Sequence, residues 1–247
     1  MSGWKWIAAS CRGTAHEKSG TRRQDAFRCV PSRGDRFIAV VSDGAGSSSH
    51  GRYGAAIACR FLSQKALSIP DLPSSDQLEN WIDELRDKLA TIADRHSLNL
   101  RDFACTLLFV VADSCGYFLG HVGDGAIVVQ QEASGPWECV SWPSGGEYAS
   151  STFFITDDLG VRLHCQRYGE SPNGFALFSD GIERLVLDFE KRTAPPGFFD
   201  TMAASMGEVQ QPGAQRVLSR QVVSYLGSPQ INQRTDDDKT LVVAVRL

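Results

Sequence analysis

Three aspartates, Asp43, Asp124 and Asp180, are the residues whose positions are most suggestive of chemistry. Each follows an apolar run typical of a buried strand, and each is directly followed by a glycine. A carboxylate at the exit of a buried strand is held rigidly, and the neighbouring glycine lets backbone carbonyls approach whatever is bound. Three such carboxylates together indicate a site for a hard cation.

Asp25 and the run Asp236–Asp238 also stand next to predicted strands. Any single aspartate has a simpler explanation, because Asp-Gly is a common turn dipeptide, and Asp124 taken alone is better explained as a hairpin turn. Strands packed side by side, however, can bring their ends together. An oxygen-only ligand set favours Mg²⁺ or Mn²⁺ over zinc. Two such ions can lower the pKa of a bridging water and hold substrate oxygens for in-line attack on phosphorus.

The remaining pattern predicts the elements that must position these acids. Alternating or apolar runs predict strands over 4–11, 26–30, 37–42, 104–112, 116–122, 126–131, 137–142, 175–179 and 240–247. Helical spacing predicts helices over 51–67, 75–94 and 214–226 and a short one from 182. We expect a loop over 13–23, hairpin turns at 113–116 and 123–125, and irregular chain over 143–173 with a β-like piece at 151–156. Grouped strands with helices inserted in pairs are typical of an α+β fold.

Composition sets the outer bounds. The 247 residues fit one large domain or at most two small ones, and the net charge of −4 gives no reason to expect nucleic acid or an anionic membrane as partner. No apolar run is long enough to span a bilayer and no apolar leader is visible, so we expect a cytoplasmic protein. Seven cysteines, an odd number without Cys-x-x-Cys spacing, are typical of free thiols.

Other catalytic signatures are missing from the sequence. No cysteine is followed six residues later by arginine, which removes the usual cysteine phosphatase loop. The sequence also lacks a Gly-x-Ser-x-Gly elbow, a His-Glu-x-x-His motif and a Walker A loop. The carboxylates remain the main candidates for catalysis.

An ordered set of short motifs resembles the metal-dependent protein phosphatase family, type 2C, and is most similar to its compact bacterial branch. The motifs, running from about residue 8 to the C-terminus, are Gly13-x-x-His16-x-x-x-Gly20-x-x-x-Gln24-Asp25, Val41-Ser-Asp-Gly44, Cys105-Thr-Leu107, Gly123-Asp-Gly125, Ser179-Asp-Gly181 and Asp237-Asp-Lys-Thr240. Gly146-Glu-Tyr148 and the segment 151–156 also look like parts of that branch.

The resemblance implies a single catalytic domain over 1–247, built as a four-layer αββα sandwich of two mainly antiparallel sheets flanked by helix pairs. It implies two Mn²⁺ or Mg²⁺ ions in a cleft at one end, with a weaker third ion at Asp124. Asp43 would bridge the two ions, and Asp237 matches the family motif better than Asp236. The full set of implied metal ligands is Asp25, Asp43, Gly44 through its carbonyl, Asp124, Asp180 and Asp237.

The sequence departs from eukaryotic members at three positions. Gln24 replaces a glutamate, Ala45 replaces a histidine proposed as general acid, and Gly20 replaces a phosphate-binding arginine. Arg22 or Arg23 can take over the phosphate contact from the same loop, or both can be solvated charges. His16 is a candidate proton donor or phosphate contact, although a lone histidine is more often structural.

The expected activity is serine/threonine protein phosphatase, in which a metal-activated water attacks the phosphomonoester. Asp25, Asp43, His16 and Arg22 are the candidate catalytic residues. The natural partner would be a phosphoprotein, including a cognate kinase or its target. Two alternatives stay open: a pseudophosphatase that binds phosphoproteins without turnover, motivated by the departures above, and a metal-dependent hydrolase of a small phosphorylated metabolite.

Overall fold

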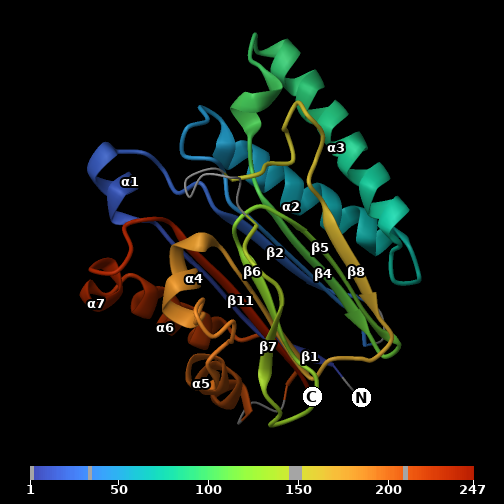
Figure 1. Cartoon of the computed structure of the whole chain (residues 1–247), viewed down its shortest axis with the longest axis vertical. Coiled ribbons are helices and arrows are strands. Elements are labelled where there is room, and N and C mark those ends of the chain that lie inside the picture. Colours follow the sequence, from blue (N-terminus) through green and yellow to red (C-terminus); the bar gives the residue numbers. More distant parts are fainter. Residues whose placement is uncertain (1–2, 33–34, 145–151, 208–210) are drawn as a thin grey trace.

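Two β-sheets stack face to face and carry helices on both outer faces, as the computed structural model shows (Figure 1). The structure describes residues 3–32, 35–144, 152–207 and 211–247. The predicted α+β sandwich is confirmed. The predicted motif at 146–148 and the start of the β-like piece at 151 lie outside the described residues.

The five-stranded sheet has the order β2-β3-β4-β5-β8, and every neighbouring pair is antiparallel. Its strands are β2 (Ala26–Pro31), β3 (Phe37–Ser42), β4 (Leu107–Asp113), β5 (Gly116–Val122) and β8 (His164–Tyr168).

The six-stranded sheet has the order β10-β1-β11-β9-β6-β7, and only the β10–β1 pair is parallel. Its strands are β1 (Trp4–Cys11), β6 (Ala126–Gln130), β7 (Trp137–Ser141), β9 (Gly174–Phe178), β10 (Gly213–Ala214) and β11 (Lys239–Arg246).

Long amphipathic helices α2 (Gly51–Ser68) and α3 (Ser75–Arg95) cover the five-stranded sheet (Figure 1). The apolar stripe predicted for α3 is buried, and Ser74 begins the helix with a capping box to Gln77. The other sheet is covered by α4 (Asp180–Val186), α5 (Pro196–Gly207) and α6 (Arg216–Leu226). In the described residues, no helix is both long and apolar enough to cross a membrane.

Strand β3 shows how the layers are held together. Phe37, Ala39 and Val41 pack into the core between the sheets, whereas Ile38 and Val40 pack under α2 and α3. Successive strand residues point to opposite faces, so a strand buried on both faces must be apolar throughout. The Phe37 ring also lies 5.7 Å from the Trp4 ring of β1, which joins the two sheets.

Three predictions of local structure were wrong. The expected loop over 13–23 contains helix α1 (Thr14–Ser19), and the expected irregular stretch over 143–173 contains β8. β8 is a polar strand at a sheet edge, so it lacks the apolar signal that marks a buried strand. The third error has more consequence: residues 123–125 are not a hairpin turn, because β5 and β6 belong to different sheets. The chain crosses from one sheet to the other at Asp124.

Gly54 tests the contact between α2 and the 3₁₀ turn Leu100–Phe103. A Cβ at Gly54 would collide with the Phe103 carbonyl oxygen. We expect Gly54→Ala to lower the free energy of unfolding by about 1–3 kcal/mol, as overpacking does. Urea titration measures this loss. Gly197→Ala is the matched control, because a Cβ there meets open space; equal effects of the two substitutions would contradict the packing argument.

Candidate active site

Three carboxylates predicted from the sequence meet at one end of the sandwich. One carboxylate oxygen from each of Asp43, Asp124 and Asp180 lies within 4.8 Å of the other two. Asp43 follows β3 of the five-stranded sheet, Asp180 follows β9 of the other sheet, and Asp124 lies in the crossing between them. The cluster therefore depends on both sheets and on their relative position.

Backbone and side-chain hydrogen bonds fix the position of Asp43. Its N–H donates to Thr106 Oγ1 at 3.0 Å, and the Thr106 N–H donates to the Asp43 carbonyl at 2.8 Å. Ser42 Oγ donates to the Thr106 carbonyl at 2.6 Å. Gly44 follows in close contact with the start of α2, where a Cβ would collide with the backbone of Gly51. Glycine is thus required at this turn.

Asp25 lies beside Asp43 and is buried, with 3% of its surface exposed. Its Oδ2 accepts a hydrogen bond from Ser179 Oγ at 2.8 Å, and the same Oγ accepts from the Thr240 N–H at 3.0 Å. Burial raises the pKa of Asp25. Burial and the Asp25 and Asp180 charges raise the pKa of Asp43 well above its usual value.

The three consecutive aspartates before β11 have three different environments. Asp236 is exposed. Asp237 is half-buried, and its charge is one of those that raise the pKa values of Asp43, Asp124 and Asp180. Asp237, unlike the exposed Asp236, therefore lies near enough to the cluster for its charge to act on all three carboxyls.

Asp238 is buried and serves the loop that carries Asp25. It accepts hydrogen bonds from the Gly13 N–H at 2.7 Å and the Gln24 N–H at 2.5 Å. It therefore ties α1 and the residue before Asp25 to the start of β11. Sequence analysis gave Asp238 no role, because a triple aspartate does not reveal which side chain turns inward.

Lys239 is a second residue that sequence analysis passed over. Its side chain is fully buried, and Nζ donates to the Asp237 carbonyl at 3.1 Å and to Asn232 Oδ1 at 3.0 Å. The ammonium group thereby holds the backbone of Asp237. No short motif in the sequence predicts this contact.

Glu183 is a further acid of the site that sequence analysis missed. It stands three residues after Asp180 on α4, so both side chains lie on one face of that helix. Burial, then the Asp124 charge, raise the pKa of Glu183 to about 7. Burial and four neighbouring carboxylates raise the pKa of Asp180 to about 8. The i, i+3 spacing was the signal that could have found Glu183.

The donor set fits a divalent cation. Asp25 Oδ1, Asp180 Oδ1 and Glu183 Oε2 are buried and have no hydrogen-bond partner in the part of the chain that the structure describes. Buried carboxylate oxygens are normally satisfied, so such atoms indicate a missing charge partner. Asp124 is partly satisfied by the Thr152 hydroxyl. Oxygen-only ligation suits Mg²⁺ or Mn²⁺.

The residues predicted to contact phosphate or to donate a proton are His16, Arg22 and Arg23. His16 Nδ1 lies 3.0 Å from Asp238 Oδ1. Arg23 Nη1 donates to the Ser10 carbonyl and its Nε to the Asp25 carbonyl, so its guanidinium is used within the fold. Arg22 is exposed on the same loop. Of the two arginines, Arg22 is therefore the one that is available to contact a ligand.

Comparison with known proteins shows the family of the chain. Residues 12–225 match the model of the protein phosphatase 2C family. Serine/threonine-protein phosphatase 3 of Escherichia coli (strain K12) is 32% identical over 252 residues, which cover 98% of each chain. The chain belongs to the protein phosphatase 2C family of serine/threonine protein phosphatases.

Solved structures share the fold. PppA, described as a key regulatory component of T6SS in Pseudomonas aeruginosa, matches with a TM-score of 0.70 at 17% identity over all of both chains. The catalytic domain of serine threonine protein phosphatase PstP, in complex with two manganese ions, matches with a TM-score of 0.66 at 15% identity, also over all of both chains. Both are less than a fifth identical, so they show the fold alone.

The raised carboxyl pKa values predict how stability depends on pH without metal. Because the pKa of Asp180 rises from 3.8 to about 8 on folding, the folded chain keeps a proton that the unfolded chain releases. This contribution is full below about pH 4 and is lost as the pH rises toward 8. In EDTA, we expect the urea midpoint to fall over this range for the native chain and to fall less for Asp180→Asn.

Excess Mn²⁺ at pH 8 should raise the midpoint of the native chain, because a ligand that binds the folded state stabilises it. Asp236→Asn is the control, since Asp236 is exposed. Identical pH profiles for the native chain and Asp180→Asn would show that the Asp180 carboxyl does not make stability depend on pH.

Proposed function

We propose that this chain hydrolyses phosphoserine and phosphothreonine in proteins at a binuclear Mn²⁺ or Mg²⁺ centre. The observation that carries the proposal is the meeting of Asp43, Asp124 and Asp180 from both sheets, with buried oxygens that lack a partner nearby. The name of the Escherichia coli relative supports the substrate class, and the two manganese ions in the PstP structure support the metal.

In this proposal Asp25, Asp43, Asp180 and Asp237 would hold the two ions, with the Gly44 carbonyl as a further ligand. Asp124 would hold a weaker third ion. When bound, the ions lower the pKa of a water molecule and neutralise charge on the phosphate. The protein fixes the ligand positions through Thr106, Ser179 and Lys239, so that little reorganisation is needed during reaction.

The cysteine that pairs with Gly44 does not suit a covalent mechanism. Cys105 forms a β-bridge with Gly44, is fully buried, and burial raises the pKa of its thiol to about 12. A thiol with such a pKa stays protonated at neutral pH and is a poor nucleophile. We therefore propose direct attack by water.

The partner would be a phosphoprotein, such as a cognate serine/threonine kinase or its target, so that hydrolysis would reverse a charge-based switch.

Asp43→Asn tests the proposal directly. We expect phosphate release from a phosphothreonine peptide in Mn²⁺ to fall at least about a thousandfold, because a carboxylate of the proposed metal centre is lost. Release should also stop in EDTA. Sugar phosphates and nucleotides are assayed alongside, and faster turnover of either would favour a metabolite hydrolase. Metal binding with no turnover of any substrate would favour the phosphoprotein-binding module that Gln24 and Ala45 suggested.

The choice between neighbouring aspartates has its own test. Asp237→Asn should lose activity about a hundredfold or more, because a ligand is removed, whereas Asp236→Asn should keep it. Phosphate release is measured across a Mn²⁺ titration. Loss of activity in Asp236→Asn alone would reverse the assignment.

Arg22 is proposed to contact the phosphate. Arg22→Gln should lower kcat/KM for the phosphopeptide about 10- to 100-fold with no change in the urea midpoint, since the side chain is exposed. Arg23→Gln should instead lower the midpoint, because it loses contacts to Ser10 and Asp25. Unchanged kinetics in Arg22→Gln would leave the arginine as a solvated charge.

His16 is proposed as a proton donor that Asp238 orients, as a carboxylate can fix the tautomer of an imidazole. A purely structural histidine would give His16→Gln the native pH–rate profile with reduced stability. A proton donor would instead give a profile that loses its alkaline limb.

A further inference from the structure

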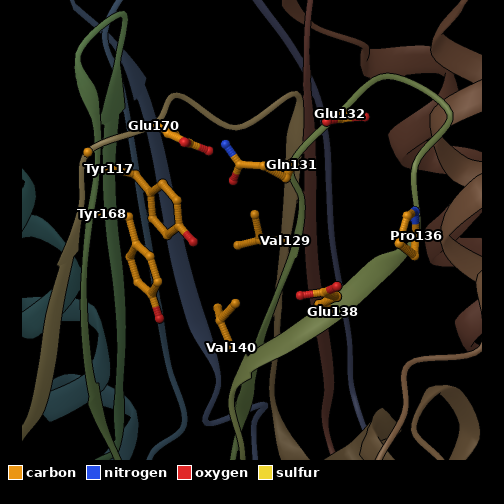
Figure 2. Close-up of a pocket in the computed structure, with 10 residues that line it drawn as sticks. Tyr117, Val129, Gln131, Glu132, Pro136, Glu138, Val140, Tyr168 and Glu170 are labelled. Carbon is orange, nitrogen blue, oxygen red and sulfur yellow. The ribbon is translucent and has the colours of Figure 1, made fainter.

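A cavity of about 810 Å³ opens between the two sheets along one side of the sandwich. Its walls come from β5 and β8 of one sheet and from β6, β7 and the loop between them of the other (Figure 2). In the described residues β8 pairs only with β5, and β7 only with β6. The cavity thus lies between two strands whose outer backbone groups have no strand partner.

Two stacked tyrosines form one wall. Tyr117 and Tyr168 are direct partners in the β5–β8 register, and their rings lie 4.3 Å apart with planes at 10°. Val129 and Val140 add apolar surface to the lining (Figure 2). The arrangement offers flat aromatic surface beside an apolar floor.

Tyr117 carries a polar group that the fold does not use. The residue is 2% exposed, and its hydroxyl points into the cavity (Figure 2). No residue that the structure describes hydrogen-bonds that hydroxyl. Burial and the Tyr168 and Glu138 neighbours raise the pKa of Tyr117, so its hydroxyl stays protonated and ready to donate. The side chain is thus almost wholly buried, and its unpartnered hydroxyl lies at the cavity surface, where it can donate to a ligand.

The charge of the lining has a single sign. Three of the ten lining residues are glutamates (Glu132, Glu138 and Glu170), and none is lysine, arginine or histidine. These glutamates take part in no ion pair among the described residues. Figure 2 shows Glu170 beside the tyrosine wall and Glu138 on the opposite wall, from β7. A cation between them would meet carboxylates on both sides.

We propose that this aromatic–acidic pocket binds an arginine side chain in an extended segment of a partner protein. A planar guanidinium can stack on a tyrosine face while its N–H groups reach carboxylates, which a lysine ammonium does less well. The free edges of β7 and β8 can pair with the backbone of an extended segment. The negative charge of the lining favours the positively charged arginine. The free strand edges favour a peptide over a free small cation, because only a peptide has a backbone that can pair with them.

The pocket is separate from the carboxylate cluster. Tyr117 precedes Asp124 by seven residues, most of them in β5, which places the two roughly 20 Å apart at about 3.3 Å per strand residue. Binding of the segment therefore needs neither metal nor phosphate. If the partner is itself a substrate, its arginine must lie at least about six extended residues from the phosphorylated residue.

The test is direct binding of the full chain to acetyl-Gly-Ser-Gly-Arg-Gly-Ser-Gly-amide by calorimetry, at low salt and in EDTA. Its partner probe carries citrulline, which keeps the shape of arginine without the charge. We expect the arginine peptide to bind at least tenfold more tightly than the citrulline peptide, and added salt to weaken it. Glu138→Gln with Glu170→Gln, and separately Tyr168→Leu, should each weaken binding at least tenfold.

Asp87→Asn is the matched control, because it removes one charge at an exposed position on α3. It should leave binding unchanged, and all variants should hydrolyse p-nitrophenyl phosphate in Mn²⁺ at the native rate. Equal affinity for the two peptides, or no binding at millimolar concentration, would overturn the proposal. Tetramethylammonium binding as tightly as the arginine peptide would also overturn it in favour of a small cation. Since no activity is measured in the binding assay, its failure leaves the proposed hydrolysis intact.

Discussion

The mutual repulsion of buried carboxylates is the constraint that governs this structure. Asp25, Asp43 and Asp180 stand close together at one end of the sandwich. Burial raises the pKa of all three carboxyls, and neighbouring carboxylate charges raise those of Asp43 and Asp180 further. Without a cation, the folded chain must keep protons on this cluster or bear the repulsion. A divalent cation bound there would remove that cost, so the strain and the proposed affinity for metal would have one origin.

The surrounding residues explain how a strained cluster stays in place. Ser179 bridges Asp25 and Thr240, Asp238 ties the start of β11 to the loop before Asp25, and Lys239 holds the Asp237 backbone. These contacts link segments that are distant in sequence but adjacent at one end of the two sheets. These contacts hold the carboxylates in place despite the unfavourable energy of bringing them together. A flexible loop could not do so, and preorganised sites are built in this way.

Much of this arrangement could be predicted from local patterns. The apolar runs before Asp43 and Asp180 predicted buried strands, and the structure places both carboxylates in one cluster. Glu183 was accessible through its helical spacing from Asp180 but was not considered. The roles of Asp238 and Lys239 could not be predicted, because they depend on which side chain of a short polar run turns inward. The strand β8 was missed because its residues are polar and its position at a sheet edge demands no apolar signal.

The crossing at Asp124 has a consequence for the whole molecule. Asp43 follows a strand of one sheet and Asp180 a strand of the other, so their separation depends on how the shared core of Trp4, Phe37 and Phe175 sets the relative position of the two sheets. A ligand that binds both carboxylates would hold the two sheets together at this end of their interface. By reciprocity, substitutions deep in the inter-sheet core would alter the affinity for such a cation, and release of the cation would loosen packing far from the cluster. The stability of the hydrophobic interior and the affinity of the ion site would thus be thermodynamically coupled.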